Sequence, residues 1–290
     1  MIYISTGGFK FNTCFESIDK LTKKGIKQIE LSGGKFFDNQ ISELKIIKKN
    51  NKNISFQVHN YFPPPKKSFV FNLGSLDDEV ANKSMNHAIN SIKLASSLGG
   101  KYYSFHAGFL LDPKVEELGK KIKKTTLFER ESSKRKFIER VNFLSDIALK
   151  EKVTLLIENN VLSHNNLKEF GSNILLMVDP EECLEVMRKV NSNVKMLVDV
   201  AHLKVSSNSL NFKKELFLKY LHNWIVAYHL SDNNGLKDSN EKITKDSWFW
   251  PYLKNDLDYY SIEVYNITID ELIEQRNLAK KMLQKNIFPK

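Results

Sequence analysis

Histidine and carboxylate side chains stand at or just after the ends of several short apolar runs in this chain of 290 residues. The set comprises His59, His106, Glu158, Asp199, His202, His229 and Glu263. Imidazole and carboxylate groups are common ligands of divalent cations, and they are also common general acids and bases. Each of these residues alone is more often a structural group, so the inference depends on the whole set. If the fold gathers them, they could bind a cation and transfer protons.

The elements that must position these residues alternate between short β-like runs and longer amphipathic stretches. Eight such strands, each followed by a crossover, predict a parallel sheet that closes on itself. We therefore expect an α/β protein formed by a single (β/α)8 TIM barrel over residues 1–290 as one domain. The seventh unit is the least clear, because residues 246–256 offer only a short helix interrupted by Pro251. The expected strands are residues 2–6, 26–32, 54–59, 101–106, 153–158, 194–199, 225–230 and 259–264.

The predicted barrel would bring the reactive side chains to one rim. In such barrels the carboxyl ends of all strands face the same side, where active sites are built. Strands three to eight would each deliver at least one member of the set there. Three carboxylates at the ends of apolar strands are costly to bury and repel one another, and a bound divalent cation is a simple remedy. The sequence therefore predicts a metal site with its active face at the carboxyl ends of the strands.

Composition sets limits on location and partners. No run of eighteen apolar residues is present, so no membrane partner is expected. The first residues lack the features of a signal peptide, and Cys14 and Cys183 fit no metal or redox spacing, which favours a cytoplasmic location. The net charge of +10 could indicate a nucleic-acid partner, but the lysines are spread over most of the predicted helices, and charge alone does not decide function.

Two short stretches leave questions open. The stretch "YHLSDNNGLKDSN" (228–240) contains His229 and Asp238, and Asn240 stands where a histidine would complete a metal-binding Asp-x-His pair. The stretch "STGG" (5–8) follows the first strand. It could present backbone N–H groups to a substrate oxygen, or it could be only a tight turn.

Several motifs, in their order and spacing, resemble the xylose-isomerase-like barrels. These motifs are "VHNYF…FNLGS", "FHAGF", "LLIENN", "LVDVAHL", "HLSDNNG" and "IEV". The superfamily includes sugar isomerases, sugar epimerases and the abasic-site enzyme endonuclease IV. The resemblance spans nearly the whole chain, but the "LGEG" stretch that should follow the strand-seven motif is absent.

The resemblance implies roles for individual residues. Glu158, Asp199, His229 and Glu263 would bind the metal ion, with Glu158 and Glu263 also acting as the catalytic proton-transfer pair. His202, His59 and His106 would contact substrate. In an enzyme of the endonuclease type, His59, His106, His202 and Asp238 would instead hold additional metal ions, and Asn240 replaces one further ligand.

Two functions follow from the resemblance. The favoured one is a divalent-metal-dependent isomerase or epimerase of a sugar, sugar phosphate or related polyol, which acts through an enediolate and uses Mn, Mg, Co or Zn. The alternative is a zinc phosphodiesterase that acts on abasic DNA. The histidines, the net charge and the basic run "KKIKK" (120–124) favour the alternative, whereas Asn240 and the missing "LGEG" oppose it. The expected partner is thus a small-molecule sugar or sugar phosphate, with nucleic acid as the less favoured partner and a homodimer left open.

Overall fold

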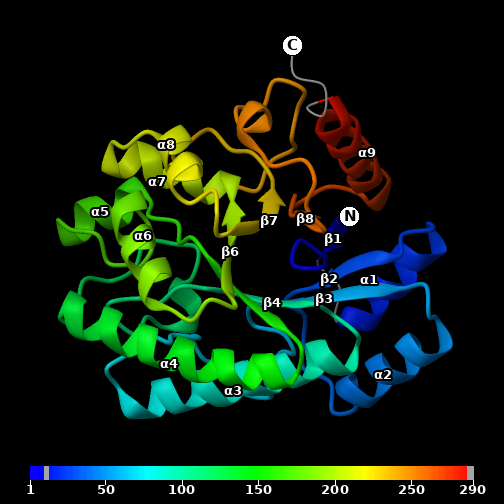
Figure 1. Ribbon diagram of the computed structural model, residues 1–290, viewed down its shortest axis with the longest axis horizontal. Coiled ribbons are helices and arrows are strands. Elements are labelled where there is room, and N and C mark those ends of the chain that lie inside the picture. Colours follow the sequence, from blue (N-terminus) through cyan, green and yellow to red (C-terminus); the bar gives the residue numbers. More distant parts are fainter. Residues whose placement is uncertain (10–12, 286–290) are drawn as a thin grey trace.

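A closed barrel of eight parallel strands forms the centre of the protein (Figure 1). The computed structural model describes residues 1–9 and 13–285, so the end of the predicted domain, residues 286–290, lies outside the described residues. The strands follow one another around the barrel in sequence order, and β8 pairs with β1. The predicted TIM barrel and all eight expected strands are confirmed. The strands are β1 (Ile2–Ser5), β2 (Gln28–Leu31), β3 (Ser55–His59), β4 (Tyr102–His106), β5 (Thr154–Glu158), β6 (Val194–Asp199), β7 (Ile225–Leu230) and β8 (Tyr259–Ile262).

Helices surround the barrel on its outside (Figure 1). The segment after β7 contains only a single 3-10 turn among its described residues, as the weak helical pattern of this unit predicts. No described helix is both long enough and apolar enough to cross a membrane. The helices are α1 (Cys14–Lys23), α2 (Gln40–Asn50), α3 (Asp78–Ser97), η1 (Val115–Glu117), α4 (Arg130–Lys150), α5 (His164–Phe170), α6 (Pro180–Lys189), α7 (Val200–Leu210), α8 (Lys214–Tyr220), η2 (Trp250–Tyr252) and α9 (Ile269–Lys285).

Below the rim, part of the barrel interior is a layer of mostly apolar side chains. A buried cluster of Tyr3, Leu156, Leu197, Ala227 and Tyr259 fills this layer. Because side chains alternate along a strand with a period of two, Leu156, Leu197 and Ala227 share a face with the residues two positions further on. Those residues are Glu158, Asp199 and His229. The charged rim therefore stands directly above an apolar floor.

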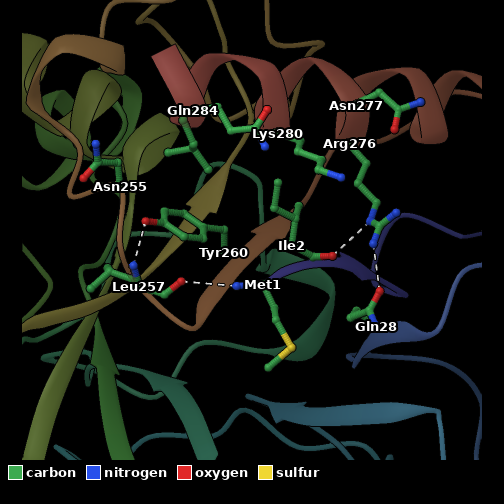
Figure 2. Close-up of a pocket in the computed structure, with 11 residues that line it drawn as sticks. Met1, Ile2, Gln28, Asn255, Leu257, Tyr260, Arg276, Asn277, Lys280 and Gln284 are labelled. Atoms are coloured by element: carbon green, nitrogen blue, oxygen red, sulfur yellow. Dashed lines mark hydrogen bonds between the residues drawn. The ribbon is translucent and has the colours of Figure 1, made fainter. Parts of the chain in front are cut away.

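Helix α9 packs against β1 and β8, which pair with each other, and its side chains reach the amino-terminal ends of the strands (Figure 2). The Arg276 guanidinium donates to the Ile2 carbonyl (3.0 Å) and to the Gln28 side-chain oxygen (2.7 Å). The amino group of Met1 donates to the carbonyl of Leu257 at 3.2 Å. A cavity of about 390 Å³ lies here, and its lining residues include no aspartate, glutamate or histidine. This cavity therefore lacks the groups that the predicted chemistry needs.

Helix α3 begins where the sequence pattern predicts, and Asp77 caps it. The carboxylate of Asp77 accepts a hydrogen bond from the backbone N–H of Val80 at 3.0 Å. Asp77→Ala should lower the free energy of unfolding by about 0.5–2 kcal/mol, because one N–H of the first turn loses its partner. Urea denaturation measures the change. Asp77→Asn is the control and should retain most of the stability, and equal stability of the Ala variant would contradict the assignment of the cap.

Candidate metal centre

Four of the predicted ligands meet at the carboxyl ends of β5 to β8. One ligand atom from each of Glu158, Asp199, His229 and Glu263 lies within 4.8 Å of the ligand atoms of the others. All four residues are buried. Glu158 and Asp199 end their strands, His229 is the last but one residue of β7, and Glu263 directly follows β8. The structure thus brings together the whole predicted set, although its role as a ligand set stays a prediction.

The hydrogen bonding of these groups fits a divalent cation. Both carboxylate oxygens of Glu158 and Oδ2 of Asp199 are buried and have no hydrogen-bond partner, and Nδ1 of His229 is buried 2.8 Å from Oε2 of Glu263. Buried polar atoms without a partner are rare and cost free energy. A cation bound among them would satisfy all of these atoms at once, and carboxylate oxygens with one imidazole nitrogen suit Zn²⁺ or Mn²⁺.

Asp199 has a second role at the start of α7. Its Oδ1 accepts hydrogen bonds from the backbone N–H groups of Ala201 (2.7 Å) and His202 (2.8 Å). This cap fixes the carboxylate and leaves Oδ2 for the site. Burial raises the pKa of Asp199 to about 7, because the neighbouring carboxylates add to desolvation and outweigh the attraction of His202.

Sequence reasoning missed Glu30, which lies behind His229. Glu30 is fully buried within β2, and its Oε2 lies 2.9 Å from Nε2 of His229. The hydroxyl group of Tyr259 donates to the same oxygen. Burial opposes the charge on Glu30, but the attraction and hydrogen bond of His229 outweigh it and hold its pKa at about 2. The available signal was a glutamate between two apolar residues, Ile29 and Leu31, inside an expected strand.

Tyr265 and two glycines orient Glu263. The Tyr265 hydroxyl donates to Oε1 of Glu263 at 2.9 Å. A Cβ atom on Gly8 would lie 2.5 Å from Cδ1 of Tyr265, and one on Gly7 would lie 3.2 Å from the Tyr265 hydroxyl. The "STGG" stretch therefore provides the space in which Tyr265 approaches the site.

His59 and His106 converge on Glu158 from the other side. Nε2 of His59 lies 3.5 Å and Nδ1 of His106 lies 3.4 Å from Oε2 of Glu158. Nδ1 of His59 is hydrogen-bonded to the hydroxyl of Ser104 at 2.9 Å. His59, His106 and Glu158 form a second group whose ligand atoms lie within 4.8 Å of one another. These two histidines are thus placed either to contact substrate or to bind another cation.

His202 and Asp238 lie beside the first group, whereas Asn240 has a structural role. Nδ1 of His202 donates to the carbonyl of Asn159 (3.0 Å), and its Nε2 lies 3.2 Å from Oδ2 of Asp238. Asn240 adopts a left-handed φ of 46°, and its side-chain amide donates to the backbone carbonyl of Glu263 at 3.0 Å. Among the described residues, Asp238 belongs to none of the groups that could hold a metal ion.

Several aromatic residues follow the strand ends and so are candidates to cover an apolar substrate face. Two of them, Phe62 and Trp250, are instead buried members of the main hydrophobic core. Tyr61 is half-buried and its hydroxyl accepts from the backbone N–H of Phe69. These three side chains therefore support the loops around the rim.

Comparisons with known proteins agree on the fold. Residues 18–264 match the family described as xylose isomerase-like TIM barrel. A probable endonuclease 4 from Sulfurihydrogenibium sp. (strain YO3AOP1) is 23% identical over 250 residues, which is 79% of this chain and 80% of that protein.

Two solved structures superimpose on nearly the whole chain. A D-tagatose 3-epimerase-like protein superimposes with a TM-score of 0.75 at 18% identity, covering 99% of this chain and 98% of that one. Endonuclease IV from Thermus thermophilus gives a TM-score of 0.56 at 12% identity, covering 98% of this chain and 99% of that one. At these identities the structures show the fold alone.

Cation binding should displace protons from this site. Burial lowers the pKa of His229, but attraction to Glu30, Glu263 and Glu158 outweighs burial and raises it well above its usual value. His229 and Asp199, with its pKa of about 7, therefore both carry protons near neutral pH that a cation must replace. The affinity for Zn²⁺ should fall as the pH is lowered from about 8 to about 6, by up to about tenfold per unit for each proton displaced. Calorimetry in two buffers of different ionisation enthalpy measures the release, and equal binding enthalpies in both would contradict it.

Gly8→Ala should disturb the site through Tyr265. The added methyl group overlaps the Tyr265 ring, so we expect a loss of about 1–3 kcal/mol in stability and weaker cation binding as Glu263 loses its hydrogen bond. Urea denaturation and a metal titration measure the two effects. In the double variant Gly8→Ala/Tyr265→Ala the overlap with the ring is gone and only the 3.0 Å contact with the Val264 carbonyl remains, so the stability losses should be less than additive. Strictly additive losses would show that the two residues are not coupled.

Proposed function

Because the chain belongs to the xylose isomerase-like TIM barrel family, we propose that it is a divalent-metal-dependent isomerase or epimerase. Its substrate would be a sugar, a sugar phosphate or a related polyol. The observation that carries the proposal is the buried convergence of Glu158, Asp199, His229 and Glu263, in which Glu158 and Asp199 have buried oxygens without a hydrogen-bond partner. The similarity in fold to a D-tagatose 3-epimerase-like protein supports the substrate class.

The four converging residues would hold the cation, which would be Mn, Mg, Co or Zn. Bound there, a divalent cation supplies Lewis-acid stabilisation of the negative charge that develops on substrate oxygens. The apolar floor of Leu156, Leu197 and Ala227 excludes water from below, which strengthens electrostatic interactions at the rim.

Glu158 and Glu263 would transfer the proton. One carboxylate removes a proton from the carbon beside the substrate carbonyl, which leaves an enediolate, and the other returns a proton to the opposite face or to the neighbouring carbon. The two differ in their surroundings: Oε1 of Glu263 accepts from Tyr265, whereas neither oxygen of Glu158 has a hydrogen-bond partner. His202, His59 and His106 would contact substrate hydroxyl groups beside Glu158.

The alternative is a zinc phosphodiesterase that acts on abasic DNA. The second metal-competent group, formed by His59, His106 and Glu158, favours it, as does the similarity to a probable endonuclease 4. The role of Asn240 opposes it. This asparagine stands where an enzyme of the endonuclease type would have a metal-binding histidine, and its amide donates a hydrogen bond to the backbone carbonyl of Glu263 instead. A carboxamide is also a poorer zinc ligand than imidazole. The isomerase is therefore the better supported function.

Solvent deuterium exchange tests the proposed proton transfer. With Mn²⁺ or Co²⁺ present, the protein should incorporate deuterium from D₂O into at least one ketose of a panel that includes D-tagatose, L-ribulose and ketose phosphates. Glu158→Gln and Glu263→Gln should each lower the rate by about 10²–10⁴-fold, since a carboxamide cannot accept the proton. Glu182→Gln removes a buried carboxylate that is paired with Arg130, and it should leave the rate unchanged. Undiminished exchange in Glu158→Gln would contradict the assigned role.

An incision assay separates the two functions. A duplex with one abasic analogue should remain intact when the isomerase assignment holds. Zinc-dependent incision, together with binding that weakens steeply with salt, would support the phosphodiesterase instead.

A further inference from the structure

Glu30 is in an unusual position for a charged residue. It lies in β2, on the far side of the barrel from the strands that carry the four predicted ligands, and none of its surface is exposed. Its Oε2 contacts His229 and Tyr259, while its Oε1 is buried without a hydrogen-bond partner. A carboxylate that served only to fill space would be costly here, since an amide or an apolar side chain would avoid burying a charge. We therefore expect the buried carboxylate of Glu30 to have a specific role.

The reason lies in the two nitrogens of His229. An ionised carboxylate can only accept hydrogen bonds, so Nε2 of His229 carries the proton that it shares with Glu30. In neutral imidazole only one nitrogen is protonated, which leaves the lone pair on Nδ1. Nδ1 lies 2.8 Å from Oε2 of Glu263, 3.3 Å from Oε1 of Glu158 and 3.9 Å from Oδ2 of Asp199. The nitrogen that can bind a cation is thus the one that faces the other ligands.

Tyr259 holds Glu30 in this position. Its hydroxyl donates to the same carboxylate oxygen that accepts from His229. The Tyr259 ring packs edge-on against Tyr3 (centroids 5.3 Å apart) and stacks on Tyr102 (5.5 Å). Tyr259 also lies four residues before Glu263 on the same inward face, so β8 carries both a ligand and the support for a second one.

We propose that Glu30 is a positioning residue of the metal centre, which sets the tautomer and orientation of His229 and increases the basicity of its Nδ1, with Tyr259 as its support. This inference rests on the proposed function only insofar as that function requires a cation at the four-residue site. A carboxylate behind a metal-binding histidine strengthens binding, and its loss commonly costs about 10–100-fold in metal affinity. Glu30 belongs to none of the groups of described residues that could hold a metal ion.

Metal titrations of the full chain test the inference. Wild-type protein, Glu30→Gln, Tyr259→Phe and the control Glu182→Gln are each titrated with Zn²⁺ in competition with a chromophoric chelator. Glu30→Gln keeps the size of the side chain but removes its charge, so its affinity should fall by about 10–100-fold. Tyr259→Phe removes a single hydrogen bond and should weaken binding by about two- to tenfold. The control should bind as the wild type does.

The visible spectrum of the Co²⁺-loaded proteins supplies a readout that a purely structural role would not change. If Glu30 governs the donor atom of His229, the absorption bands of Glu30→Gln should shift in position or intensity, whereas those of Glu182→Gln should match the wild type. Circular dichroism and urea denaturation check that each variant folds. If Glu30→Gln fails to fold, Tyr259→Phe decides the question through its smaller loss of affinity.

The outcomes separate this inference from the proposed function. If the wild type binds no stoichiometric cation, both the metal centre and the role of Glu30 are wrong. If the wild type binds and Glu30→Gln shows the same affinity and spectrum, only the role of Glu30 is wrong. If the wild type exchanges deuterium and Glu30→Gln binds the cation as tightly as the wild type does, the proposed isomerase function stands and the positioning role of Glu30 is wrong.

Discussion

Repulsion between buried carboxylates is the main constraint on the structure at the carboxyl ends of the strands. Glu158, Asp199 and Glu263 share one dehydrated space, and Glu30 adds a fourth negative group on the other side of His229. Two like charges about 4 Å apart repel by about 4 kcal/mol even at an effective dielectric constant of about 20. His229 stands between them, with Nε2 toward Glu30 and Nδ1 toward the other three. The protonated imidazole is therefore the protein's own compensation for this repulsion, and a divalent cation would be a stronger one.

The three carboxylates of this site differ in their surroundings. Below the rim the barrel is filled by apolar side chains and tyrosine rings, so no solvent screens the charges from that direction. On the outside each carboxylate has a different anchor: Asp199 caps α7, Glu263 accepts from Tyr265, and Glu158 faces histidines. Groups of the same chemical type therefore differ in how freely they can exchange a proton. Such differences suit a pair of glutamates with complementary roles in one reaction.

The sequence predicts the barrel and the four converging residues because both depend on local patterns. Each strand is a short apolar run, and Glu158 and Asp199 end such runs visibly. Glu30 has no such mark: Leu31 and Ser32 follow it within the expected strand, and its partner His229 is 199 residues away along the chain. Only the register of β2 between β1 and β3, which pairs Glu30 with Ser5 and Gln57, places its side chain.

The contacts of Tyr265 and Asn240 could not be predicted from local sequence patterns for a similar reason. An aromatic residue just after a strand usually packs in the core, and only the approach permitted by Gly7 and Gly8 brings the Tyr265 hydroxyl to Glu263. The resemblance implies that Asn240 stands where enzymes of the endonuclease type have a histidine. The sequence does not show the left-handed backbone at this position, which asparagine tolerates better than most residues and which directs its amide to the end of β8.

The two halves of the chain contribute different residues to the site. All four metal-competent groups of the main site come from β5 to β8, whereas Glu30, His59 and His106 come from β2, β3 and β4. The second half thus carries the four-residue group, and the first half carries Glu30, which contacts His229, and His59 and His106, which approach Glu158. The pairing of β8 with β1 closes the ring, and in the closed ring His229 is surrounded by carboxylates from both halves of the chain.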